Sequence, residues 1–199
     1  MAKQSLDGWT VVTGGFLGIL AWLAGYAATH LFTYREVQDT AVHQAHEFFE
    51  GEVPTEELVG WAFYNAHFVS VEIRNLPLVG RMSVDLIGAD GGLSPVLYGI
   101  PLVTLFLAGV VAVAVRGVND LVTGTATGSA ILPGYLLCCL AGVWLFSLSI
   151  GDVRGGPQLL PAIVVAGIAY PIVAGGLGGA VGAKLVGYAR SDEQPDSPG

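Results

Sequence analysis

Residues 94–115 read SPVLYGIPLVTLFLAGVVAVAV, which is 22 residues without a charged side chain. At 1.5 Å per residue, a helix of this length measures about 33 Å and spans the roughly 30 Å hydrocarbon core of a bilayer. Arg116 follows directly and ends the stretch with a charge. The stretch therefore predicts a transmembrane helix and an integral membrane protein.

The composition of the whole chain agrees with this class. Of 199 residues, 53% are hydrophobic and 12% are charged, whereas a soluble globular domain averages roughly 25% charged residues. The mean hydropathy is +0.64. Together these values indicate an all-α integral membrane protein, because an α-helix satisfies its own backbone hydrogen bonds inside a bilayer.

Three further uncharged stretches have spanning length, so four spans are predicted and both ends of the chain lie on one side. The first is longer than the 7 to 15 apolar residues of a signal peptide, and only Lys3 precedes it, so we expect no cleavage. The predicted division is an N-terminal segment (1–8), transmembrane helix 1 (9–33), an acidic extramembrane segment (34–93), transmembrane helices 2 (94–115), 3 (127–150) and 4 (157–183), and a disordered tail (191–199).

The charged residues are unevenly distributed. Segment 34–93 holds ten carboxylates and three arginines, a net charge of −7 out of the total of −8. Basic residues are denser in the short segments on the other side, and Lys and Arg are enriched in cytoplasmic segments. We therefore expect a plasma-membrane protein with cytoplasmic N- and C-termini. Nucleic acid is not expected as a partner, because phosphate contacts need clustered Lys or Arg.

Four polar residues of the acidic segment recur at steps of 4, 3 and 4 and share one face of a predicted amphipathic helix. They are Asp39, His43, His46 and Glu50. One interpretation is a metal or proton site, because imidazole and carboxylate groups one turn apart converge on one point. The other, which we expect, is a solvated acidic face. A zinc-protease motif fails because Glu50 stands where the second histidine is needed, and the sequence predicts no cofactor.

An aromatic block follows in a second predicted helix, residues 58–68, whose start is marked by Thr55, Glu56 and Glu57. A helix this short cannot span a bilayer, so we expect it either in the membrane interface or packed against the helix ends. His67 is expected to be a hydrogen-bonded structural histidine, with a lipid-headgroup contact as the alternative. The candidate interfacial residues are Trp61, Phe63, Tyr64, His67 and Phe68.

Apolar and polar residues alternate over 69–74 and again over 81–86. A period of two predicts β-strands, with 75–80 as the turn region of a hairpin. Because two strands alone are marginally stable, an extended loop is the alternative.

Several features occur together in this chain: a glycine-rich first span, the block WAFYNAHF at 61–68, an acidic balance, and six Arg against two Lys. In these features the chain resembles an uncharacterised family of small multi-pass membrane proteins from haloarchaea. The resemblance implies a plasma-membrane protein working in multimolar salt, where exposed charges are screened within about 3 Å. Some relatives carry a loose transporter label, and the resemblance implies no more specific activity.

Small residues recur at helical spacing in two spans and predict close helix packing. Such faces serve either the chain's own bundle or contact with another chain, and the sequence leaves both open. The two faces are Gly14, Gly18, Ala21 and Gly25 in the first span, and Gly175, Gly179 and Ala183 in the fourth.

The predicted spans carry no ionisable residue near their middle, although transport pathways usually have such groups at that depth. We therefore expect a non-enzymatic structural or accessory subunit, embedded in the lipid bilayer as part of a homo-oligomer or a larger membrane complex. The alternative is an oligomeric channel or transporter for a small solute or ion, in which polar residues of several subunits line a shared pathway.

Overall fold

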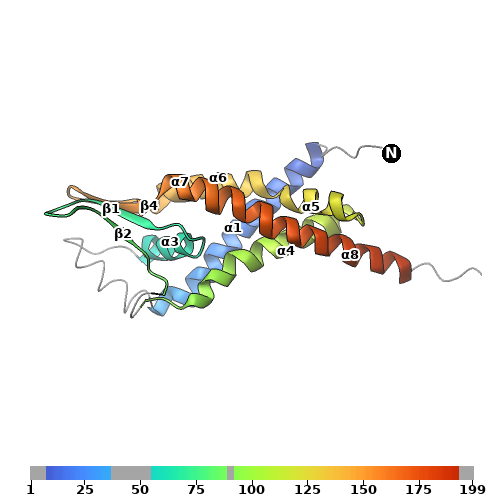
Figure 1. The fold of residues 1–199 in the computed structure, drawn as a ribbon, viewed down its shortest axis with the longest axis horizontal. Helices are drawn as coiled ribbons and strands as arrows, with labels where there is room; N and C mark the ends of the chain where they lie inside the picture. Colours follow the sequence, from blue (N-terminus) through green and yellow to red (C-terminus); the bar gives the residue numbers. More distant parts are fainter. Residues whose placement is uncertain (1–7, 37–54, 89–91, 193–199) are drawn as a thin grey trace, which may run out of the picture.

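The computed structural model describes residues 8–36, 55–88 and 92–192. The molecule is elongated, with a helical bundle along most of its length and a small sheet at one end (Figure 1). In chain order the elements are α1 (Gly8–Glu36), α3 (Thr55–Asn65), β1 (Val71–Leu76), β2 (Gly80–Val84), η2 (Pro95–Tyr98), α4 (Gly99–Arg116), α5 (Leu121–Ser129), α6 (Leu132–Leu145), β3 (Leu148–Ile150), β4 (Val153–Pro157), α7 (Leu159–Pro161), η3 (Ala162–Ala169), η4 (Pro171–Gly175) and α8 (Gly176–Asp192).

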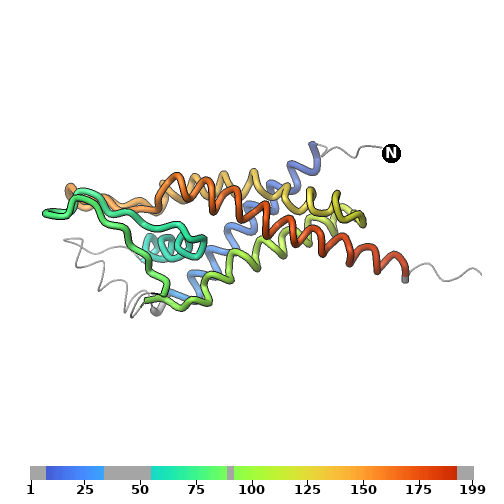
Figure 2. Tube along the Cα trace, viewed as in Figure 1, coloured from blue at the N-terminus to red at the C-terminus, as the bar shows by residue number. Residues whose placement is uncertain are grey.

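Within the described residues, four helical segments are long and apolar enough to cross a membrane: Gly8–Thr33, Pro95–Arg116, Leu121–Leu145 and Leu159–Ser191. The structure thus confirms a mostly helical chain with four helices of spanning length. α4 and α5 pack against α8, and α1 packs against α6 and α4. The start of α1 and the end of α8 lie at the end of the bundle away from the sheet (Figure 2).

The third span begins six residues before the predicted residue 127. α4 ends at Gly117, which has a left-handed φ of 63°. α5 then begins after Asp120, whose side chain accepts a hydrogen bond from the Thr123 N–H at 2.8 Å and so caps the helix. In the polar stretch that follows, the Thr125 hydroxyl donates to the Leu121 carbonyl at 2.9 Å, which satisfies this polar side chain within the helix.

The fourth span continues past the predicted residue 183, and its first half has wide π-helical turns, η3 and η4. There the Tyr170 N–H donates to the carbonyl of Val165, five residues back. Pro171 has no N–H and therefore removes one bond from a regular α-helical ladder. The span nevertheless stays helical from Leu159 to Ser191.

The prediction of an all-α fold is corrected by an antiparallel sheet with the strand order β2-β1-β4-β3. β1 and β2 form the hairpin that the alternating pattern indicates, with Ile73 opposite Met82. β3 and β4 form a second hairpin, and β3 takes the last three residues of the third span, which was expected to continue to 150. β4 pairs with β1, with Ile73 opposite Gly155. The second hairpin supports the first, because a two-stranded sheet alone is marginally stable.

We call α3 together with the four strands the cap. The β1–β4 pairing joins the segment after α1 to the segment between α6 and α7 (Figure 1). α3 packs against α1 and against the sheet, and every residue from Leu58 to Asn65 is buried. On β1, Val71 and Ile73 are buried whereas Arg74 is exposed. One face of the sheet therefore covers the core and the other carries charge.

Candidate functional site

The small residues of the first span lie against the chain's own third span. A Cβ added at Gly14 would overlap the backbone carbonyl of Ala130, and one added at Gly18 would overlap that of Ile131. Glycine is therefore required at both positions for the backbones to approach this closely. Two further members of this face are also covered by the same chain, namely Ala21 and Gly25.

The small residues of the fourth span are used in the same way. A Cβ added at Gly175 would lie 2.8 Å from the Gly128 carbonyl oxygen, and one added at Gly179 would lie 2.8 Å from the Gly128 Cα. A Cβ added at Gly124 would come within 2.6 Å of the Ala183 Cβ. The sequence left open whether these faces pack within the chain's own bundle or contact another chain. In the structure both faces pack within the chain's own bundle.

The aromatic block of α3 is enclosed by the protein and packs against helix ends, one of the two positions that the sequence allowed. The Trp61 Nε1–H donates to the Phe146 carbonyl at 2.8 Å, and the Tyr64 hydroxyl donates to the Cys139 carbonyl. Cys139 belongs to α6 and Phe146 follows its last residue, so the block is tied to the C-terminal half of α6. The enclosed members are at most 2% exposed: Trp61, Phe63, Tyr64 and His67.

Phe68 differs from the rest of the block because its side chain is 65% exposed. Its backbone has a φ of 58°, which turns the chain sharply between α3 and β1. The ring stacks on Tyr98 with 4.6 Å between centroids. Phe68 is thus the one member of the block whose placement fits an interfacial side chain.

His67 joins α3 to the third span through both ring nitrogens. Nδ1 lies 2.7 Å from the Phe63 carbonyl oxygen, and Nε2 lies 2.6 Å from the Tyr135 hydroxyl. Because a carbonyl can only accept, Nδ1 carries the proton, and Nε2 accepts from the tyrosine. His67 is therefore a satisfied structural histidine, as expected, and makes no contact with lipid.

Burial controls the charge of this histidine. Desolvation lowers the pKa of His67 from its ordinary value of 6.5 to about 4, partly opposed by the hydrogen bond to the Phe63 carbonyl. The imidazole is therefore neutral at pH 7. The neutral imidazole connects the cap to the bundle through its two hydrogen bonds. Neither ring nitrogen is left free to bind a ligand.

The predicted metal stripe, Asp39, His43, His46 and Glu50, lies outside the described residues. Within residues 8–36, 55–88 and 92–192, no group of three His, Cys, Asp or Glu side chains is placed to hold a metal ion.

Three arginines form a line across the exposed face of the sheet. Arg74 of β1 is paired with Arg81 of β2 and with Arg154 of β4. Paired residues in antiparallel strands point to the same face, with Cβ atoms about 5 Å apart. We call Arg81, Arg74 and Arg154 the arginine row. Glu72 forms ion pairs with Arg74 at 2.6 Å and with Arg81 at 2.9 Å.

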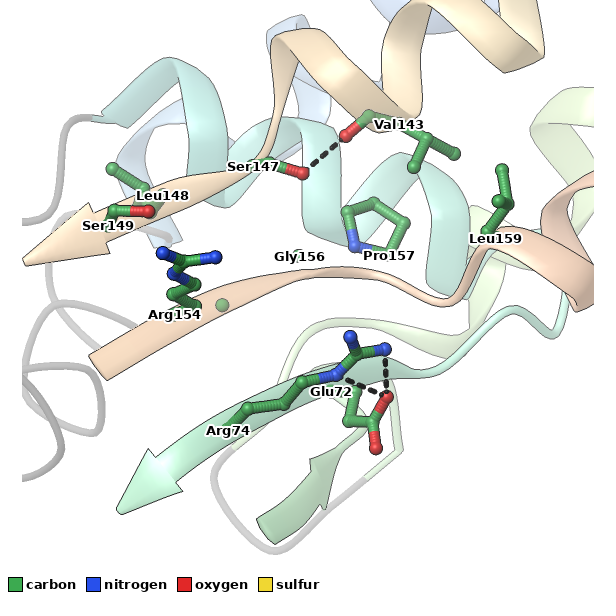
Figure 3. A pocket seen from close by; sticks show the side chains of 11 residues that line it. Glu72, Arg74, Val143, Ser147, Leu148, Ser149, Arg154, Gly156, Pro157 and Leu159 are labelled. Carbon is green, nitrogen blue, oxygen red and sulfur yellow. Dashed lines mark hydrogen bonds and ion pairs between the residues drawn. The ribbon is translucent and has the colours of Figure 1, made fainter. Parts of the chain in front are cut away.

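A cavity of about 340 Å³ opens beside this row (Figure 3). Arg74 and Arg154 line it together with the hydroxyls of Ser147 and Ser149. Arg154 extends from β4 toward Ser149 on β3, while the Arg74 guanidinium lies against Glu72 (Figure 3). The apolar part of the lining comes from the ends of the third and fourth spans, including Val143 and Leu159.

The comparisons with known proteins identify the family but no activity. Residues 1–186 match the family of unknown function DUF7978. The chain belongs to this family. No curated protein and no solved structure matches it. The function of this DUF7978 member therefore has to be argued from its own geometry.

The cavity was missed in the sequence because its residues are far apart in the chain. β3 and β4 did carry a signal: Leu148 and Ile150 alternate with serines, and Gly151-Asp152 is a two-residue hairpin turn. The pairing of Arg74 with Arg154 carried none, because it depends on the register between two separate hairpins.

Proposed function

We propose that this chain is a non-enzymatic, multi-pass plasma-membrane protein that serves as a structural or accessory subunit in a homo-oligomer or a larger membrane complex. Its spans support this proposal, because they carry no charged side chain between 8–33, 95–115, 121–145 and 159–183. The bundle also uses its small-residue faces internally. Association with other proteins is therefore assigned to the cap.

The observation that carries the proposal is the tip of the β1–β2 hairpin. Leu78 and Val79 are 108% and 67% exposed, and the tip projects from the end of the cap away from the bundle (Figure 1). Contiguous exposed apolar side chains are found where a protein contacts another protein or a membrane. Leu78 also has a φ of 71°, a conformation that a leucine rarely adopts, so the turn holds this side chain outward.

The test compares this tip with another exposed apolar residue. The double variant Leu78→Ser, Val79→Ser should remain folded but lose its oligomer or its copurifying partner, because neither side chain contributes to the core. Val96→Ser is the matched control, since Val96 is 72% exposed at the base of α4. Native mass measurement after mild detergent extraction gives the readout. A wild-type chain that is monomeric and without a partner contradicts the proposal.

The alternative is an oligomeric channel or transporter, and one observation favours it. The π-helical turns of η3 and η4 occupy the first half of the fourth span, and π-helical segments are frequent at functional sites. Purified wild-type chain in liposomes tests this alternative by ion and solute flux. We expect flux no greater than in empty liposomes, because residues 8–33, 95–115, 121–145 and 159–183 offer a pathway no charged side chain.

We further propose that the cap lies outside the cell and the termini in the cytoplasm. Arg116 is the last residue of α4, and Lys184 and Arg190 belong to α8. The ends of both helices lie away from the cap (Figure 1), which supports this orientation. Single cysteines at Ser83 and Ser191, in a Cys138→Ala, Cys139→Ala background, report the two sides. An impermeant thiol reagent should label only Ser83→Cys in intact cells, and the opposite result reverses the orientation.

A further inference from the structure

The arginine row is a positive charge that is only partly compensated, on an acidic protein. Like charges directly opposite each other destabilise a sheet, yet three guanidiniums stand in register on three adjacent strands. Glu72 offsets part of this repulsion through its ion pairs with Arg74 and Arg81. Three positive charges and one negative charge leave a net +2. Among the residues that the structure describes, Arg154 has no carboxylate within ion-pair distance.

The cavity beside the row presents the donors that an oxyanion needs. Guanidinium groups donate two parallel hydrogen bonds to phosphate or carboxylate oxygens, and Arg74 and Arg154 line the cavity from adjacent strands. Ser149 adds a hydroxyl opposite Arg154. A volume of about 340 Å³ lies at the lower end of the range of small-ligand sites. The site therefore fits a compact anion.

The position of the cavity relates it to the membrane surface. Its apolar lining, Val143 and Leu159, lies at the ends of two spans. Trp144, next to Val143, is 84% exposed, and tryptophan at a span end is typical of the headgroup level. The apolar wall of the cavity thus faces the bilayer boundary, and the arginines lie on its water side.

We propose that this cavity binds a phosphate-type oxyanion, with Arg154 and Arg74 as its charged donors. Its position at the ends of two spans favours the phosphodiester of a membrane lipid over a free anion, since Val143 and Leu159 can contact the glycerol and acyl carbons. Glu72 lowers the affinity, because it occupies Arg74 and adds a negative charge at the rim. The proposal is independent of the accessory role, which depends on the hairpin tip.

The experiment uses the full chain in maltoside micelles at low salt and three probes. The probes are inorganic phosphate, dihexanoyl phosphatidylglycerol, and dihexanoylglycerol, which has the same acyl chains without phosphate. Binding is measured as the Kd from the ligand-dependent shift of thermal unfolding and from adducts in native mass spectra. We expect the phospholipid to bind more tightly than inorganic phosphate, and dihexanoylglycerol not to bind.

Charge variants connect the binding to the arginine row. Arg154→Gln should weaken binding about tenfold, the loss expected for one charge-assisted hydrogen-bonding group. Glu72→Gln should strengthen it about threefold, because it frees Arg74. Lys184→Gln removes one positive charge at the other end of the molecule and should leave the Kd unchanged. Melting without ligand shows that each variant is folded.

The outcomes separate the two sources of the anion. Equal affinity for inorganic phosphate and phospholipid, both lost in Arg154→Gln, supports an oxyanion site and overturns the lipid as its source. If neither inorganic phosphate nor dihexanoyl phosphatidylglycerol binds, the site is overturned. Equal weakening by Arg154→Gln and Lys184→Gln also overturns it, because binding would then depend on net charge and not on the cavity.

Discussion

In the bundle, a Cβ added at Gly18 would overlap the backbone carbonyl of Ile131, so α1 and the third span meet backbone to backbone. In the cap, aromatic rings pack against one another and against the bundle: the Phe63 ring meets the Trp22 ring of α1 edge-on at 5.4 Å. The two regions thus reach tight packing in different ways. In the bundle backbone meets backbone, whereas in the cap aromatic rings fill the space, including the space over Gly60, where an added Cβ would overlap the Phe146 ring.

The proposed placement of the bundle in a bilayer and of the cap in water accounts for this difference. Lipid tails are as apolar as leucine, so helices in a bilayer gain little by burying apolar area and associate by close backbone contact. Outside the bilayer, removing an aromatic side chain from water stabilises the fold. This accounts for the complete burial of Trp61, Phe63 and Tyr64 in α3, and for the large exposed side chains on the helices, such as Leu31 and Val122.

The largest effect is expected where the bundle allows no side chain. Gly18→Leu forces α1 away from Ile131 and Tyr135 and should lower the free energy of unfolding by at least about 4 kcal/mol. The control Leu20→Ala changes a residue that is 43% exposed, and should cost about 1 kcal/mol or less. Unfolding by SDS titration measures both. Equal losses for the two variants would show that backbone contact does not hold the bundle.

The next effect concerns the charge of the cap's histidine. The folded pKa of His67 is about 4, below the value near 6.5 of an unfolded chain. The unfolded state therefore binds the proton first, and the free energy of unfolding should be constant above pH 6.5 and fall toward pH 4 by an amount on the order of 3 kcal/mol.

The pH series should be run on wild type, His67→Gln and His30→Gln. His67→Gln should lose most of this pH dependence, because the glutamine amide does not titrate. The rings of Tyr135 and Tyr170 that lie against His67 should then surround a neutral group at every pH. His30→Gln should keep it. The same slope in His67→Gln and wild type would place the titrating group elsewhere.

A smaller effect is expected from the cap's hydrogen bonds. Trp61→Phe removes the donor to the Phe146 carbonyl and part of a fully buried side chain, so it should lower the free energy of unfolding by about 2 kcal/mol. Phe68→Leu is the control, since Phe68 is largely exposed. Thermal unfolding followed by near-UV circular dichroism reports the aromatic packing of the cap directly. A larger loss for Phe68→Leu would reverse the assignment of the cap's core.

The smallest effect tests a helix end of the bundle that does depend on a side chain. Asp120→Ala removes the carboxylate that caps α5 and should lower the melting temperature by less than Trp61→Phe does. Asp120→Asn should restore it, because asparagine also accepts at an N-cap. The hydrogen bonds from Thr123 lower the pKa of Asp120, so the Asp120 carboxylate should stop capping α5 only in strong acid. A melting temperature of Asp120→Asn as low as that of Asp120→Ala would exclude capping as the cause.

Much of the bundle was predictable because its signal is local. Long uncharged runs indicate spanning helices, and small residues at steps of three and four indicate close packing. Which helix Gly18 contacts was not predictable, because Ile131 lies in a different span and helix order is set by tertiary packing. The β1–β2 hairpin was visible as alternation over two segments, whereas β3 alternates over only four residues at the end of an apolar run that is predicted equally well as helix.

The sequence by itself determined four helices long and apolar enough to span a membrane, the small-residue faces and the hydrogen-bonded character of His67, since each depends on residue type and spacing within one segment. Only the tertiary structure decided that the aromatic block is enclosed, that both small-residue faces serve the chain's own bundle, and that Arg74 stands opposite Arg154. The reason is physical: a strand register and a helix neighbour are set by contacts between distant segments, which hydropathy and periodicity do not encode.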